Sequence, residues 1–195
     1  IHRPDWPAFG QVFRLGWPIG LNWLSEVGLF GMAGVMIGWV GKVELAAHGI
    51  AMQITSATFM VHLGLSQATT VRSGSAWGRR DRDGLRRVAR AGFVLSMGFV
   101  AVTIAVFLTV PERLVGPFVD PAAPERGGGL TIGATVLACA AVFQLVDAGQ
   151  VMALGVLRGI QDTRVPMIIA AVSYWGVGTP AAYVLGFPLG FGAPG

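Results

Sequence analysis

Charged residues are scarce in this sequence. They make up 12% of the 195 residues, whereas hydrophobic residues make up 53% and the mean hydropathy is +0.64. A water-soluble domain carries about one quarter charged residues, so the composition excludes an ordinary soluble domain. The single cysteine, Cys139, leaves no disulfide framework and no cysteine-based metal site within the chain. The composition is that of an integral membrane protein.

Long apolar runs take the place of the missing charge. As a helix, roughly 20 residues cross the ~30 Å hydrocarbon core of a bilayer. Five segments reach this length and, two acids apart, contain no charge: 15–40, 45–71, 91–110, 130–157 and 165–189. They are too long for the strands of a membrane barrel. The sequence therefore predicts an all-α, multi-pass protein with five transmembrane helices.

Basic residues gather on one side of these predicted spans. If the N-terminus is cytoplasmic, that side holds eleven of the fourteen Lys and Arg, and Lys42, Arg113 and Arg126 lie opposite. Cytoplasmic flanks collect positive charge, so we expect this orientation, in the cytoplasmic (inner) membrane of a bacterium. The arginine-rich run 79–90 lies in a short connection between two spans. We interpret it as a loop near anionic membrane lipid, not as a nucleic-acid site.

Two acids stand alone inside the apolar runs, Glu26 in the first and Asp147 in the fourth. A carboxylate near the bilayer centre costs about 2.5–3.5 kcal/mol even on a lenient scale, and such residues usually line an ion or substrate pathway. Glu26 follows Arg14 by 12 residues and Asp147 precedes Arg158 by 11. At about 1.5 Å per residue both acids lie roughly 16–18 Å from those arginines. If their helices face one cavity, they can share a proton or jointly hold a cation.

Amide and aromatic side chains flank each acid one helical turn away. We predict that they line the cavity and suit an amphipathic organic cation through ring faces and a few hydrogen bonds. Polar groups that only hold helices together are the alternative. The predicted lining residues are Asn22, Trp23, Phe30, Phe143, Gln144 and Gln150.

The second span carries many polar side chains on two faces. Gln53 and Ser56 follow one face, and Thr55, Thr58 and His62 follow the other. One face is expected to line the cavity, and Gln53 is included among the lining residues. His62 is either a proton relay or a hydrogen-bonding group between helices.

The order and spacing of three blocks resemble the C-terminal lobe of the multidrug and toxic compound extrusion (MATE) transporters. The blocks are LGWPIGLNWLSEVGLFG at 15–31, ELAAHGIAMQITSATFMVHLGLSQATTVRSG at 44–74 and AVFQLVDAGQVMALGVLRGIQDTRVP at 141–166, followed by SYWGVGTPAAYVLG at 173–186. The resemblance implies five helices, the seventh to eleventh, of a twelve-helix fold with two six-helix lobes. The chain is then expected to be a fragment that needs a matching N-terminal lobe of six helices.

The resemblance also implies a role for both acids, since Glu26 and Asp147 match the family's acidic positions on its seventh and tenth helices. The implied activity is efflux of cationic amphipathic small molecules by H⁺ or Na⁺ antiport, without a cofactor; if the ion is Na⁺, the same two carboxylates are its expected ligands. Phe143 falls where some sodium-coupled members place a tyrosine, and a phenyl ring offers no oxygen to Na⁺.

Other activities fit the sequence less well. A flippase for lipid-linked sugars, from the same wider fold group, needs cationic residues inside the cavity, and no Lys or Arg lies in mid-span. An intramembrane enzyme needs a nucleophile with a base or a metal-ligand cluster, and the three histidines are far apart in sequence. A non-transporting structural subunit stays open as an alternative.

Overall fold

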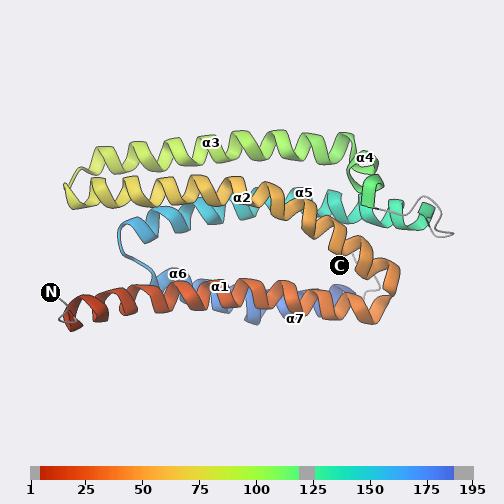
Figure 1. Ribbon diagram of the computed structural model, residues 1–195, viewed down its shortest axis with the longest axis horizontal. Helices are drawn as coiled ribbons and strands as arrows, with labels where there is room; N and C mark the ends of the chain where they lie inside the picture. The colour runs from red at the N-terminus through yellow and green to blue at the C-terminus, as the bar shows by residue number, and fades with distance from the viewer. Residues whose placement is uncertain (1–4, 119–125, 187–195) are drawn as a thin grey trace.

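The computed structural model describes residues 5–118 and 126–186, all of them in helices or short connections between helices. The prediction of an all-α membrane protein is confirmed. The long helices run between the same two ends of the molecule (Figure 1), and we call the end that holds the start of α1 the N-terminal end. The elements are α1 (Trp6–Val40), α2 (Lys42–Gly78), α3 (Arg82–Thr109), α4 (Pro111–Val115), η1 (Gly116–Phe118), α5 (Arg126–Gly159), α6 (Arg164–Ala171), η2 (Val172–Gly178) and α7 (Thr179–Gly186).

Local signals in the sequence explain where two of the long helices begin. The side chain of Asp5 accepts a hydrogen bond from the Ala8 backbone N–H at 3.1 Å and caps α1. Asp81 does the same for α3, accepting from Gly84 N–H at 2.7 Å. Both side chains satisfy a backbone donor that the first turn of a helix leaves unpaired. Residue 80 makes the turn before α3 with a positive φ of 57°.

The helices extend beyond the predicted apolar segments, and the last one is not a regular α-helix. Val172–Gly178 forms a π-helix between α6 and α7, which apolar length alone does not predict. The structure describes this last helical run as far as Gly186, so the end of the predicted span 165–189 lies outside the described residues.

Four helical runs are long and apolar enough to cross a membrane, counted over the described residues. They are α1, α3, Leu130–Gly159 of α5, and Arg164–Val184. The remaining predicted span, 45–71, lies in α2, which is not among the four. However, α2 runs between the same two ends of the molecule as α1 and α3 (Figure 1), and the span 45–71 stays a prediction. Its polar residues His62, Ser66, Thr69 and Ser73 are buried against other helices, which explains its lower hydropathy.

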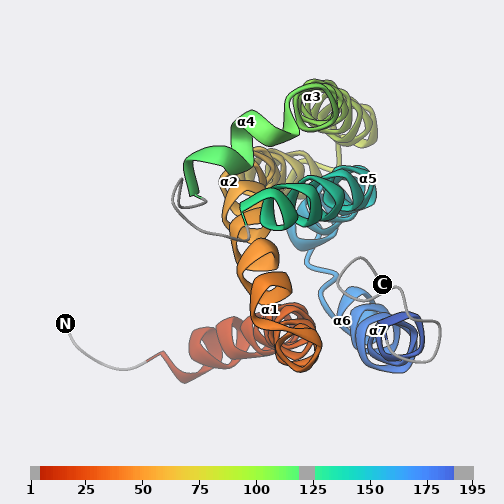
Figure 2. The same cartoon turned by 90° about the vertical axis from the view of Figure 1, so that its right-hand side faces the viewer.

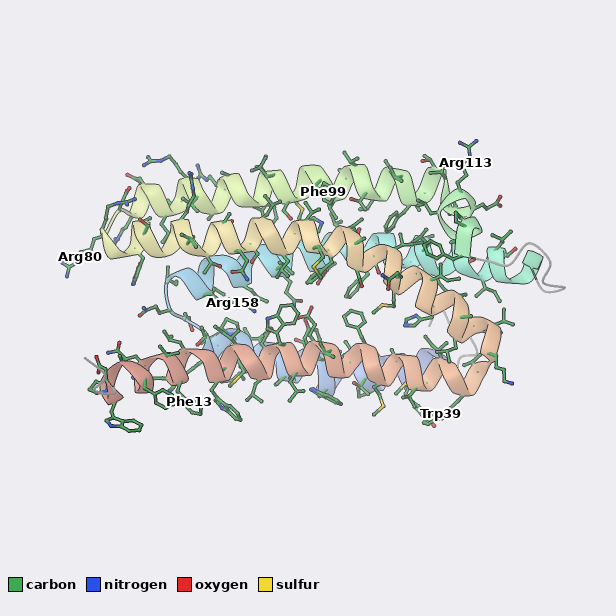
Figure 3. The ribbon with its side chains drawn as sticks, viewed as in Figure 1. Phe13, Trp39, Arg80, Phe99, Arg113 and Arg158 are labelled. Atoms are coloured by element: carbon green, nitrogen blue, oxygen red, sulfur yellow. The ribbon has the colours of Figure 1, made fainter. Side chains whose placement is uncertain are left out.

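Packing divides the helices into two groups. α2, α3 and α5 make their most extensive contacts with one another, and the end-on view in Figure 2 shows them together, apart from α1 and α6–α7. Phe107, Val115, Leu137 and Ala141 form a core cluster at the end of α3. Apolar side chains also cover the outside: Phe13 on α1 points away from the other helices (Figure 3) and is 60% exposed. An outer surface of this kind suits lipid.

Candidate functional site

The side chains of α1 at the site follow one helical stripe. Pro18, Asn22, Glu26 and Phe30 are spaced four residues apart, which places them on one face of the helix. Trp23 stands beside this stripe. The Glu26 side chain is half-buried, whereas much of α1 is exposed, and the helix buries only Pro18, Asn22 and Ile37. The inward stripe therefore carries the only acid of this helix toward the rest of the molecule.

α5 presents the second acid from the tightly packed group of helices. Phe143, Gln144 and Asp147 lie within one turn of each other. Asp147 is half-buried, and Gln144 is 4% exposed. The Gln144 amide Nε2 donates hydrogen bonds to Thr58 Oγ1 and, at 3.5 Å, to the backbone oxygen of Thr55 on α2. These contacts fix the amide beside the acid.

α1, α2 and α5 enclose a cavity of about 420 Å³ that holds both acids. Six of the residues predicted from the sequence line it: Trp23, Glu26, Phe30, Phe143, Gln144 and Asp147. The rings of Phe30 and Phe143 meet edge to face, with centroids 6.0 Å apart and planes at 87°. This contact bridges α1 and α5 across the cavity. The two carboxylates thus share one mostly apolar space.

Three predicted lining residues are not among those that line the cavity. Asn22 faces a separate small space nearer the N-terminal end. Gln150 lies one turn beyond Asp147 and donates a hydrogen bond to the Tyr174 hydroxyl. Gln53 is exposed, because the cavity stripe of α2 runs through Met52, Ser56 and their neighbours and leaves Gln53 to one side. Their spacing correctly placed Asn22 and Gln150 on the same helix faces as the two acids. It did not predict that both lie outside the cavity along the helix axis.

One stripe of α2 lines the cavity. It includes Ser56 from one of the polar faces recognised in the sequence and Thr55 from the other. The stripe follows i, i+4, i+7 and i+8 spacing from His48, a pattern that could have revealed it in the sequence. His62 is outside the cavity: its Nδ1 and Ser96 Oγ are 2.8 Å apart in the buried contact between α2 and α3. The lining residues from α2 are His48, Ala51, Met52, Thr55, Ser56, Phe59 and Met60.

The cavity combines two acidic side chains with a mostly apolar wall. Two carboxylates provide negative charge, and the Gln144 Oε1 atom is buried without a hydrogen-bond partner among the described residues. Ring faces and methionine sulfurs surround these groups, and such walls attract organic cations and adapt to their shape. No group of three or more His, Cys, Asp or Glu side chains that could hold a metal ion is present in the described part of the chain.

Known proteins resemble the chain in sequence and in fold. Residues 18–184 match the family model MatE. A probable multidrug resistance protein NorM of Rhizobium meliloti is 47% identical over 193 residues, which cover 99% of this chain and 41% of that protein. A probable multidrug resistance protein NorM of Agrobacterium fabrum is 44% identical over 193 residues, which cover 99% of this chain and 42% of that protein. The chain thus spans about two fifths of the length of these curated relatives.

Solved structures agree on the fold. A crystal structure of MATE in complex with MaL6 superposes with a TM-score of 0.84 at 18% identity, covering 94% of this chain and 40% of that chain. A crystal structure of MATE in the bent conformation gives a TM-score of 0.83 at 19% identity, with the same coverage. With a family model matched over residues 18–184 and these relatives, the chain belongs to the MatE family of transporters.

Proposed function

We propose that this chain forms one lobe of a secondary active exporter of amphipathic organic cations, driven by H⁺ or Na⁺ antiport. The observation that carries this proposal is the cavity of about 420 Å³ in which Glu26 and Asp147 face one space between aromatic walls. The relatives named as multidrug resistance proteins support the substrate class. The family is one of transporters, not of enzymes.

Competition for two carboxylates explains the coupling. Two ionised acids in an apolar cavity are costly without a counter-charge, so either a drug cation or coupling ions must neutralise them. Ions that enter from outside weaken drug binding and release the drug outward. Their departure to the inside restores the negative charge that binds the next drug. Efflux then follows from the different affinities of the two states for ion and drug.

A second lobe and an orientation complete the proposal. The curated relatives are more than twice as long as this chain, so we assign the missing half of the transporter to a matching lobe of six helices. In the sequence, the side of the predicted spans that holds the N-terminus carries eleven of the fourteen basic residues, which supports a cytoplasmic position for that side. The bacterial cytoplasmic membrane is the expected location, with lipid covering the outer apolar side chains.

Efflux measurements on the full-length transporter that carries this chain test the proposal. Glu26→Gln and Asp147→Asn keep side-chain size and remove charge. Asp83→Asn is the matched control, because its carboxylate is exposed in the first turn of α3 and pairs only loosely with Arg86 at 4.0 Å. A fluorescent organic cation is loaded, and efflux is followed under a proton gradient and a sodium gradient separately.

We expect both cavity variants to lose gradient-driven efflux and Asp83→Asn to keep it. The gradient that drives the wild type identifies the coupling ion. Full efflux by folded Glu26→Gln and Asp147→Asn would reject the carboxylate mechanism, because no other acid lines the cavity within the described residues.

A further inference from the structure

A row of polar side chains continues from the carboxylate cavity toward the N-terminal end. It lies where α1, α5 and the α6–η2 run approach each other, and we call it the polar seam. On α5 its members are Gln150 and Arg158, which lie three and eleven residues after Asp147 on the same helix face. Figure 3 shows Arg158, the outermost of these, between α5 and α1. The seam consists of Asn22, Gln150, Arg158, Asp162 and Tyr174.

Asn22 is the central member of the seam. It is 3% exposed, and neither its Nδ2 nor its Oδ1 has a hydrogen-bond partner among the described residues. Leaving both ends of a buried amide unpaired is unfavourable. The side chain lines a space of about 10 Å³ together with Arg158, Asp162 and Thr163. That volume is about the smallest that accommodates one water molecule, and the polar side chains in the lining offer it hydrogen-bonding groups.

Polar groups flank the small space on both sides. On the outer side, Asp162 and Thr163 also line a second space of about 470 Å³ at the N-terminal end, bordered by Arg14 and Arg164. On the inner side, Asn22 lies one turn from Glu26 on the same face of α1. Asn22 is thus a buried polar side chain between Glu26 and the space that borders the N-terminal surface.

A hydrogen bond joins the two inner members of the seam, Gln150 and Tyr174. Gln150 Nε2 donates to the hydroxyl of Tyr174, which the π-helix η2 carries. Such π segments are frequent at functional sites because they shift side chains out of α-helical register. Here the shifted register brings a phenol beside α5 near both acids.

We propose that the polar seam conducts the coupling proton between Glu26 and the N-terminal side, through a water molecule held by Asn22. This inference rests on the proposed antiport function and assigns its ion. Protonated Glu26 gives its proton to this water, and the water passes one of its own protons outward to solvent beside Asp162. Glu26 is left as a carboxylate near the Arg158 guanidinium. The guanidinium charge repels Na⁺, whereas a hydrogen-bonded water molecule can still transfer a proton.

An isosteric pair at position 22 tests the seam. Asn22→Thr keeps a hydrogen-bonding group, and Asn22→Val has the same shape without one. The full-length transporter is reconstituted in liposomes, and proton release on drug addition is followed with a trapped pH dye. We expect proton release by Asn22→Val to be about tenfold slower than by Asn22→Thr. This corresponds to an activation free energy that is higher by about 1.4 kcal/mol. Drug affinity should stay within about twofold, because Asn22 lies outside the cavity.

The possible outcomes separate this inference from the proposed function. Equal proton release by Asn22→Thr and Asn22→Val would overturn the seam, and so would drug-driven Na⁺ movement without proton movement in the wild type. In both cases loss of efflux in Glu26→Gln and Asp147→Asn still upholds antiport. If neither variant at position 22 folds, Asp162→Leu replaces them, because Asp162 is half-buried at the outer end of the seam. The same slowing is expected there, and an unchanged rate would refute the pathway.

Discussion

Adding one methyl group at Gly155 should loosen the contact between α2 and α5. Gly155 and Gly159 lie four residues apart on α5, opposite small residues of α2, and this spacing lets membrane helices approach closely. A Cβ at Gly155 would lie 2.6 Å from Ser66 Oγ and 2.8 Å from the Ser66 backbone oxygen. Two hydrogen bonds cross the same contact, from Ser66 Oγ to Val151 O at 2.8 Å and from Thr70 Oγ1 to Gly155 O at 2.9 Å.

The magnitude follows from the backbone contact, since a backbone oxygen cannot rotate away. Ordinary contact begins at 3.4 Å, so the 2.8 Å approach to Ser66 O requires a displacement of 3.4 − 2.8 = 0.6 Å. Overpacking of this kind costs about 1–3 kcal/mol. Alanine also favours the helix over glycine by about 1 kcal/mol. Gly149→Ala is the matched control on the same helix, because its nearest neighbour, Phe93 Cε2, lies 3.8 Å from the added Cβ.

The helix preference cancels in the comparison of the two variants. We therefore expect Gly155→Ala to be less stable than Gly149→Ala by about 1–3 kcal/mol. Reversible unfolding in detergent micelles, followed by circular dichroism, measures the difference. Equal stability of the two variants would show that α2 and α5 accommodate the methyl group without cost, and would refute the argument from close approach.

Two further substitutions address the cavity and His62. Phe143→Leu should weaken binding of an aromatic cation by about 0.5–2 kcal/mol, or roughly two- to thirtyfold in Kd, through loss of the ring face; fluorescence titration measures this, and an equal loss for a neutral analogue of the same shape would argue against a cation–ring contact. Ser96→Ala removes the hydrogen-bond partner of His62 Nδ1 and should cost about 0.5–1.5 kcal/mol of stability with efflux unchanged. Loss of efflux in a folded Ser96→Ala protein would instead indicate a proton relay through His62.

The scarcity of charge singled out the two acids, whereas helical periodicity placed the polar side chains around them less well. Glu26 and Asp147 stand out because charge is rare in an apolar run, and the fixed helical rise set them at similar depth. Both acids line one cavity. Asn22 and Gln150 lie on the same helix faces as these acids but belong to the polar seam, nearer the N-terminal end. A residue one turn away shares a face, yet it is displaced by about 5.4 Å along the helix axis, enough to leave the cavity.

The contribution of Tyr174 could not be predicted from periodicity at all. Its position depends on the π-helix Val172–Gly178, whose wider turn breaks the 3.6-residue period on which a helical face is assigned. His62 illustrates a different limit. A polar residue on an apolar helix has the same signal in the sequence whether it faces a cavity or a neighbouring hydroxyl, and only the packing of α2 against α3 distinguishes the two.

The two acids lie on helices that differ in how extensively they pack against the rest of the molecule. Asp147 belongs to the closely packed group of α2, α3 and α5, which small residues and interhelical hydrogen bonds hold together. Glu26 belongs to α1, which buries few of its residues and makes fewer contacts with that group. A change in the tilt of α1 therefore alters the spacing of the carboxylates while the α5 wall of the cavity stays fixed. Under the proposed antiport function, unequal packing would give the lobe a means to change its affinity for ion and drug between two states.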